Sequence, residues 1–378
     1  MKRKYICIIL LLVIFGSLSC VSRASFRYRP VPRQSLVVDT GVFYDELAPY
    51  GRWFRLDPYG WVWTPAGVSF GWRPYTHGHW VWTDYGWTWV SRWRWGWAPF
   101  HYGRWFHHSH HGWVWVPGTV WGPAWVVWRH QPGWIGWAPM PPQVEWRSGI
   151  GFNLSYGEMD NLIEPFAYTF VEERYLPEGT LDQHLELAAR NVTLLRGTRN
   201  VTNYESIENR VINRSVNVER IENATGRKVT QHRIVDTNPA GVMNGEMVRG
   251  NEVITYRPAV TAVRPERAPR SVEPERGRPP ADITRREETE RRHLEQEQRR
   301  AQTDLERLHR REQQRSAGRP ASDELRNQQE RERRALNEQR QREQQVLRGR
   351  QETRRKVEPS PEGRSRPEPA RKPAGRKP

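Results

Sequence analysis

A tryptophan-rich unit repeats along the first part of the chain with a period of 25 to 26 residues. The stretch "DYGWTWV" at residues 84–90 is matched by Gly60-Trp-Val-Trp63 and by Gly112-Trp-Val-Trp115. A degenerate fourth unit runs from Gly122-Pro-Ala-Trp125 to Gly136-Trp-Ala-Pro139. Periods of this length are typical of supersecondary units that need their neighbours for stability. The chain is therefore expected to fold as an array of similar units.

Each unit has the pattern strand, turn, strand. Apolar residues alternate over Gly78-His-Trp-Val-Trp82, and Thr83-Asp-Tyr-Gly86 supplies turn residues, with glycine where a positive φ is needed. A strand has a two-residue period, so Trp87 and Trp89 share one face. The pattern predicts a mainly β fold of repeated tryptophan-rich β-hairpins over residues 41–146.

The tryptophans of this domain have a structural and a possible binding role. All 20 lie between Trp53 and Trp146, and most are expected in the core, because a single hairpin is only marginally stable. At about 200 Å² per ring they need roughly 4,000 Å² of burial, so some are expected to be exposed. Exposed indoles suit sugar rings, cations or nucleic-acid bases. The residues predicted to stack on a ligand are Trp61, Trp63, Trp87, Trp89, Trp113 and Trp115.

The N-terminus predicts export. A basic start, an apolar run from Tyr5 to Phe15 and a small-residue exit ending at Cys20 are typical of a secretory signal over residues 1–20. Ser17-Leu-Ser-Cys20 resembles a bacterial lipoprotein box, which makes Cys20 the expected lipidation site and the periplasm or outer membrane the expected location. Cleavage after Ala24 without lipidation is the alternative. Residues 21–40 are expected to be a linker.

Catalytic and metal-binding motifs are weak. The histidine tract suggests a metal site only through its composition, and the candidate ligands are His107, His108, His110 and His111. Gly67-Val-Ser-Phe-Gly71 has the spelling of a nucleophile elbow, but that motif requires a strand that feeds a helix, which the sequence does not predict here. The chain is therefore expected to have no catalytic residues, no enzymatic activity and no cofactor.

The segment 147–258 has an ordinary composition and predicts a small β or α+β module. Thr180-Leu-Asp-Gln183 spells a capping box before Leu185-Glu-Leu-Ala-Ala189, which predicts a short helix there. Short strands are predicted over Asn191-Val-Thr-Leu-Leu195, Val201-Thr-Asn-Tyr204, Arg210-Val-Ile-Asn213 and 216–221.

The C-terminal part is charged and lacks aromatic residues. Residues 264–378 carry 33 Lys+Arg against 22 Asp+Glu, or +11 of the formal +17, which favours anionic partners. A Pro/Arg-rich linker over 259–281 precedes charged helices over 282–357, and 358–378 form a basic tail expected to be disordered. Leucines at 325, 336 and 347 allow a loose coiled coil, and a solvated charged helix is the alternative.

Longer motifs support a family resemblance. The stretches "FYDELAPYGRW", "GWRPYTHGHWVWTDYGWTWVS" and "GWVWVPGTVWGPAWVVWR", followed by "RNVTLLRGTRNVTNY", resemble an uncharacterised family of Trp-rich bacterial envelope proteins, a domain of unknown function. Its shorter relatives are tryptophan-repeat lipoproteins. The resemblance covers about residues 40–256 and implies export and an envelope setting, with no catalytic residues to carry over. The histidine tract departs from the acidic, glycine-containing turn expected at that place.

Together these features predict a non-enzymatic, exported envelope protein. Its Trp/Arg repeats are expected to bind or scaffold, with a cell-wall or surface polysaccharide or a protein as partner, while the basic tail contacts an anionic polymer. The lipid anchor is the expected link to a membrane, and nucleic acid is not an expected partner. The alternative is an assembly factor that docks protein partners and oligomerises through its C-terminal helices.

Overall fold

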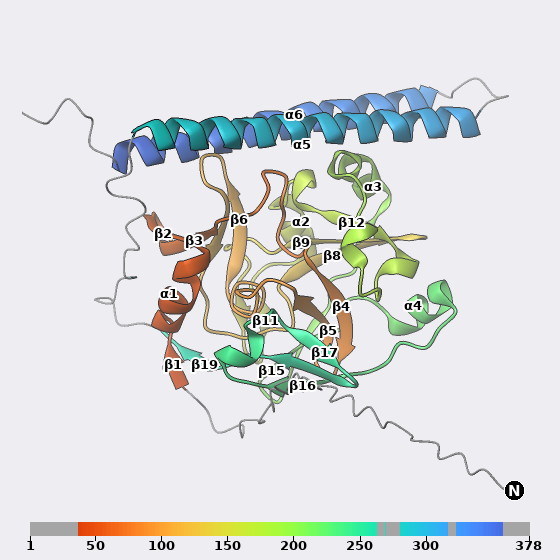
Figure 1. Ribbon diagram of the computed structural model, residues 1–378. Coiled ribbons are helices and arrows are strands. Elements are labelled where there is room, and N and C mark those ends of the chain that lie inside the picture. Colours follow the sequence, from red (N-terminus) through yellow and green to blue (C-terminus); the bar gives the residue numbers. More distant parts are fainter. Residues whose placement is uncertain (1–36, 263–268, 270–279, 317–322, 358–378) are drawn as a thin grey trace, which may run out of the picture.

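The computed structural model describes residues 37–262, 269, 280–316 and 323–357 (Figure 1). It consists of a β-rich head, residues 37–262, and a pair of long helices that lies across one side of the head. No helix in the described part of the chain is long and apolar enough to cross a membrane. The predicted signal, Cys20, most of the 21–40 linker and the 358–378 tail lie outside the described residues.

The repeat units form four β-hairpins, as predicted. They are β2 (Gly51–Leu56) with β3 (Gly60–Pro65), β4 (Gly78–Thr83) with β5 (Gly86–Ser91), β6 (Arg104–His108) with β7 (Gly112–Val116), and β8 (Val126–Gln131) with β9 (Trp134–Pro139). Gly86 has φ +78° in its turn, which confirms the left-handed position expected there. The prediction of a mainly β head built from tryptophan-rich hairpins is confirmed.

Cross-strand tryptophan pairs define the register of the hairpins. Trp80 lies opposite Trp89, and Trp128 lies opposite Trp137. The first and third hairpins join edge to edge through Trp63 and Trp115 into the sheet β2-β3-β7-β6. Directly opposed aromatic residues are among the more stabilising pairs in antiparallel sheets, so the repeat fixes both the pairing and the packing.

Strands from the second half of the head complete the other two large sheets. Their orders are β12-β9-β8-β13 and β14-β15-β5-β4, and three small sheets pair β1 with β19, β10 with β11, and β16-β18-β17. The bounds of these strands are β1 (Val37–Asp39), β10 (Trp146–Arg147), β11 (Gly151–Phe152), β12 (Thr169–Glu172), β13 (Arg199–Asn200), β14 (Tyr204–Ile207), β15 (Arg210–Asn213), β16 (Arg233–Asp236), β17 (Met247–Arg249), β18 (Glu252–Thr255) and β19 (Ala259–Thr261).

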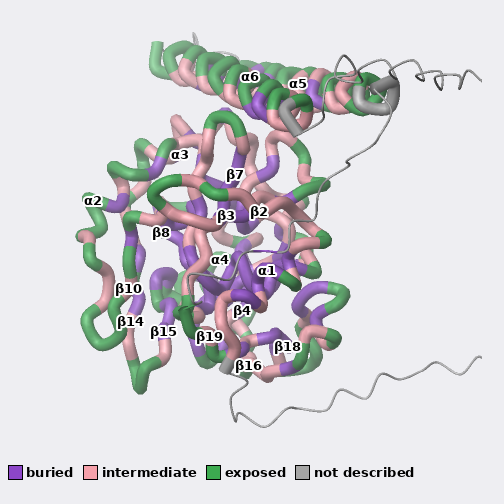
Figure 2. The backbone as a smooth tube through the Cα atoms, turned by 90° about the vertical axis from the view of Figure 1, so that its left-hand side faces the viewer, coloured by how far each residue is buried: buried purple, intermediate pink, exposed green. Residues whose placement is uncertain are grey.

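The head has one large hydrophobic core instead of two. A single cluster of buried residues runs from Phe43 to Tyr256, so the expected boundary near residue 147 does not separate two cores. The two segments share one core because strands β12, β13 and β15 of the second segment pair with strands of the hairpin repeat. Buried positions are concentrated inside the head (Figure 2).

Several predictions for residues 180–221 were wrong. The expected helix over 185–189 is absent, and 3-10 turns at Leu181–Gln183 and Ala188–Arg190 take its place. The expected strand at 191–195 is helix α3 (Asn191–Gly197), which buries Leu194. The expected strand at 216–221 is largely helix α4 (Val218–Thr225), which begins where Asn217 caps the Arg220 amide. The head also contains α1 (Gly41–Leu47) and α2 (Tyr156–Asn161).

The two C-terminal helices form an antiparallel helical hairpin that rests on the head (Figure 1). They are α5 (Pro280–Arg315) and α6 (Asp323–Val357). Leu336 and Leu347 are buried, and Leu325 is half-buried, so this stripe of leucines packs within the molecule. The predicted alternatives of a loose coiled coil and a fully solvated helix both differ from this arrangement, because the helices also pack against α3 and the Ala188–Arg190 turn.

Candidate functional site

The predicted stacking tryptophans are mostly inside the core. Trp63, Trp87, Trp89 and Trp115 are 0% exposed and Trp113 is 7% exposed. The prediction that these five rings stack on a ligand is therefore wrong for this fold, because each hairpin turns its tryptophan pair toward the neighbouring sheets. Trp61 is the exception, as it is half-buried with the Arg55 guanidinium 5.9 Å from its ring centroid.

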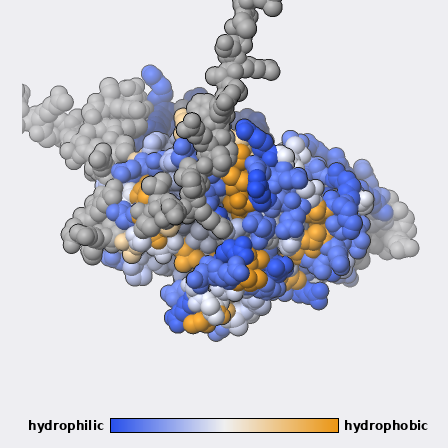
Figure 3. Space-filling model, turned by 90° about the horizontal axis from the view of Figure 1, so that it is seen from below, coloured by the Kyte–Doolittle hydropathy of each residue, from blue (hydrophilic) through white to orange (hydrophobic). Residues whose placement is uncertain are grey.

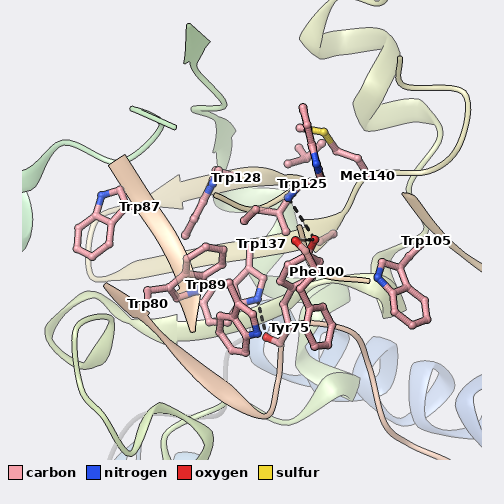
Figure 4. Close-up of a cluster of buried hydrophobic side chains, with 14 of the residues drawn as sticks. Tyr75, Trp80, Trp87, Trp89, Phe100, Trp105, Trp125, Trp128, Trp137 and Met140 are labelled. Carbon is pink, nitrogen blue, oxygen red and sulfur yellow. Dashed lines mark hydrogen bonds between the residues drawn. The ribbon is translucent and has the colours of Figure 1, made fainter. Parts of the chain in front are cut away.

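Most of the other tryptophans are also enclosed. Of the 20, 13 are buried and seven are half-buried, so fewer indoles are accessible than the small size of the head led us to expect. The head accommodates them because rings pack on rings, as in the cluster of Tyr75, Trp80, Trp89 and Trp137 (Figure 4). Backbone carbonyls satisfy some of the indole N–H groups, and Trp137 donates to the Tyr75 carbonyl at 3.0 Å.

The histidine tract lies beside the helical hairpin, and its rings do not converge on one point. His107 packs edge-on against Trp113 and Phe166, and the rings of His108 and His111 stack 4.7 Å apart. His110 is exposed and points its ring nitrogen at the Ser109 hydroxyl. In the described structure no three of these side chains place ligand atoms close enough for a metal ion. The metal role proposed for the tract has no geometric support.

Residues 67–71, whose sequence matches the nucleophile-elbow motif, form a loop that contacts the helical hairpin. Ser69 is exposed, and its hydroxyl makes no hydrogen bond to any described residue, so no base activates it. The amide of Phe70 donates to Glu297 of α5 at 3.1 Å, and Arg350 of α6 lies over the Phe70 ring. The loop therefore helps to seat the helical hairpin on the head.

A buried acid and base pair connects the two halves of the head. The Nε2 atom of His101 lies 3.0 Å from Glu246, and both side chains are at most 1% exposed. Glu246 also accepts hydrogen bonds from the Ser91 amide and the Thr255 hydroxyl. Substrate has no access to a pair this deeply enclosed, so its role is to hold β5 and β18 together.

A second polar cluster, here called the docking cluster, joins the helical hairpin to the head. It consists of Arg190, Glu312, Glu332 and His309. The guanidinium of Arg190 lies 3.3 Å from Glu312 and 3.7 Å from Glu332, and His309 lies 2.7 Å from Glu332. His309, Glu312 and Glu332 form the one group in the described part of the chain that could hold a metal ion. Arg190 already supplies a positive charge there, so the cluster needs no metal.

Around the docking cluster, few apolar side chains of the helical hairpin contact the head. Leu305 and Leu336 pack on Ala189 and Leu187 of the head. The hairpin is otherwise attached through polar groups and single close contacts, such as Gly349 against the backbone of His110. Charged groups therefore provide much of the specificity of this attachment.

The outward side of α5 carries a basic stripe, here called the arginine face. Its residues recur every three or four positions and are all exposed: Arg285, Thr289, Arg292, Gln296, Arg299, Arg300, Thr303, Arg307, Arg310 and Gln314. They lie opposite Glu297, Leu305 and Glu312, which face the head. The stripe itself contains no acidic residue, but Arg292, Arg299 and Arg307 pair with the neighbouring Glu288, Glu295 and Asp304. Arg300 and Arg310 have no carboxylate within 4.0 Å among the described residues.

The face of the head on the far side from the helical hairpin shows no extended apolar patch among its described residues (Figure 3). Hydrophobic residues there form small separate spots in a hydrophilic surface, where the described atoms are visible (Figure 3). Isolated apolar spots of this kind are normal on protein surfaces. This view of the head therefore indicates no large apolar docking surface among the described residues.

The comparisons with known proteins identify a domain but no activity. Residues 44–144, from α1 to just beyond β9, match the model of a family described as "Family of unknown function (DUF6600)". The chain thus contains a domain of an uncharacterised family, as the resemblance of its motifs indicated. No curated protein and no solved structure matches the chain.

Proposed function

We propose that this chain is a non-enzymatic protein of the bacterial cell envelope whose arginine face binds an anionic polysaccharide. In this proposal the tryptophan-cored head is a rigid scaffold, and the helical hairpin displays the binding surface. The observation that carries the proposal is the stripe of exposed arginines on α5, in which Arg300 and Arg310 have no carboxylate within 4.0 Å among the described residues. Export and a lipid anchor at Cys20 are part of the same proposal and rest on the N-terminal sequence.

The geometry of the arginine face suits a polymer better than a small ion. From Arg285 to Arg310 the helix is about 38 Å long at 1.5 Å per residue. Guanidinium groups pair with carboxylates and phosphates through two hydrogen bonds each. Several weak contacts along one strand add up, because each bound unit raises the effective concentration of the next. An extended polyanion is therefore the ligand class that uses the whole stripe.

Retention of the full chain on immobilised polygalacturonate tests the proposal. We expect the triple variant R300Q/R307Q/R310Q to lose most of its retention at moderate salt, since these residues belong to the arginine face. Glutamine keeps a good helix propensity, so α5 is expected to remain folded. The wild-type protein is not expected to be retained on neutral dextran.

The matched control is R291Q/R326Q/R334Q, which removes the same charge from exposed arginines outside the arginine face. These arginines pair with Glu288, Asp323 and Glu330, as Arg307 does with Asp304. We expect this variant to keep most of its retention. Equal losses in the two variants mean that net charge alone causes binding, and unchanged retention in the first variant contradicts the proposal.

A further inference from the structure

One position in the repeat departs from its counterparts. The tripeptides Leu47-Ala-Pro49, Trp97-Ala-Pro99 and Trp137-Ala-Pro139 have alanine in the middle, whereas the second unit has Trp72-Arg-Pro74. Ala98 and Ala138 are 0% exposed and Ala48 is half-buried, so two of the three counterparts enclose a small side chain here. Arg73 thus places a long cationic side chain at a position where the other repeat units have the methyl group of alanine.

The surroundings of Arg73 leave its charge without a counterion. Its Nε atom donates to the Thr169 hydroxyl at 3.2 Å. The two terminal nitrogens have no hydrogen-bond partner, and no carboxylate lies within 4.0 Å, among the described residues. Desolvation lowers the pKa of Arg73 to about 10, while Glu343 opposes this shift from a greater distance. The side chain is half-buried, so the group is a partly desolvated cation at neutral pH, and such groups are ordinarily paired.

A pocket of about 430 Å³ opens beside Arg73. Its apolar wall includes Trp72, Trp93 and Leu185, and His77 and Ser69 supply polar groups. Trp93 is held firmly, because it stacks on Trp95 at 5.3 Å with an interplanar angle of 15°. The volume lies within the usual range for small-ligand sites, which combine apolar walls with a few placed polar groups.

We propose that this pocket binds a pyranose sugar acid, with its carboxylate on Arg73 and its C–H face toward the Trp93 wall. The guanidinium supplies a fork of donors that matches a carboxylate. The indole wall supplies the surface on which the apolar face of a sugar ring packs. The inference deepens the proposed function, on which it rests, by naming uronic acid residues as the units of the bound polysaccharide.

Titration calorimetry of the full chain with D-galacturonic acid tests the pocket directly. We expect saturable binding by the wild-type protein, at least about tenfold weaker binding by R73Q, and unchanged binding by R94Q, which removes an exposed arginine outside the pocket. The neutral methyl ester and acetate are expected to bind more weakly than the acid, because each lacks one of the two recognised features.

The outcomes separate this inference from the proposed function and from misfolding. The R300Q/R307Q/R310Q variant is expected to bind the monosaccharide normally, since the pocket lies on the head, so a failure of polymer retention leaves this titration interpretable. A thermal unfolding scan checks that R73Q stays folded, which we expect because the substitution removes an unpaired charge. No binding of the acid by the wild-type protein, equal binding by R73Q, or equal affinity for acetate overturns the inference.

Discussion

The core of the head and the contact between head and helical hairpin are both buried, but they are built from different groups. In the head, indole packs on indole, as where Trp80 contacts Trp89, Trp128 and Trp137. At the hairpin contact, Arg190 and His309 meet Glu312 and Glu332, with few apolar side chains around them. The head therefore gains stability from apolar burial, whereas attachment of the hairpin depends on complementary charge.

The largest effect is expected from removing a core ring. The Trp89→Ala variant is predicted to lose about 3–5 kcal/mol of unfolding free energy, because Trp89 is 0% exposed and contacts Tyr75, Trp80 and Phe100. Urea denaturation of the full chain measures this loss. Trp61→Ala is the matched control, since this ring is half-buried and faces Arg55. A similar loss of unfolding free energy in both variants contradicts the assignment of Trp89 to the core and of Trp61 to the edge of the head.

A charge deleted from the docking cluster is expected to free the hairpin without unfolding the head. Glu332→Gln leaves Arg190 and His309 short of their buried partner, which costs about 3 kcal/mol of docking free energy. Hydrogen exchange followed by mass spectrometry is predicted to show faster exchange in α6 and α3, with the hairpin strands of the head unchanged. Glu330→Gln, at an exposed ion pair with Arg334, serves as the control, and its exchange pattern is expected to match the wild type.

A methyl group at Gly349 tests the close approach of α6 to the head. An added Cβ there lies 2.4 Å from the carbonyl oxygen of His110, a backbone atom that has little room to move. Alanine favours the helix by about 1 kcal/mol, but the overlap is predicted to weaken docking by about 1–2 kcal/mol. Slower exchange throughout α6 in Gly349→Ala argues against this contact, because it means that the helix was stabilised without being displaced.

Acid is expected to have the smallest effect of the four. Burial, followed by Arg342 and His108, lowers the pKa of His107 to about 4, and burial together with Arg52 does the same for His111. Histidine in the unfolded chain titrates near 6.5, so the unfolded state binds more protons between pH 6.5 and 4. Stability is therefore lost as the pH falls through this window.

The measurement for this prediction is the melting temperature of the full chain at pH 7 and pH 4.5. The variant H107Q/H111Q is predicted to lose less stability on acidification than the wild type, since it lacks two of the histidines whose pKa is lowered in the folded state. His110→Gln changes an exposed ring and is expected to follow the wild-type profile. Identical acid sensitivity in all three proteins refutes the role of His107 and His111.

The hairpin repeat was predictable from the sequence because its signals are local. Turn glycines such as Gly86 and alternating tryptophans specify each unit without reference to the rest of the chain. The segments at 191–195 and 216–221 were misread as strands, because their β-branched residues favour strands while tertiary packing of Leu194 and Ile221 selects helices. The prediction that Trp87 and Trp89 stack on a ligand was wrong, because strand periodicity places the two residues on one face without indicating whether that face is buried.

The docking of the helices depends on pairs far apart in the chain, such as Arg190 with Glu312, which no local pattern specifies. The arginine face, in contrast, was within reach of sequence analysis. Its arginines recur at helical spacing without an acidic residue between Arg285 and Arg310 on that stripe. Likewise, Arg73 was visible as the departure of one repeat unit from the others.

The paired tryptophans of the β-hairpins build a closed core, and we propose that ligands bind outside that core, at the arginine face and at the Arg73 pocket. Acrylamide quenching of the intrinsic fluorescence of the native full chain tests this claim most directly. We predict a blue-shifted emission and a small quenching constant that rises sharply on unfolding in urea, because 13 of the 20 indoles are buried and the other seven are half-buried. Strong quenching of the native protein, close to that of the unfolded chain, would contradict the account and return the repeated indoles to the surface as candidate ligand-stacking residues.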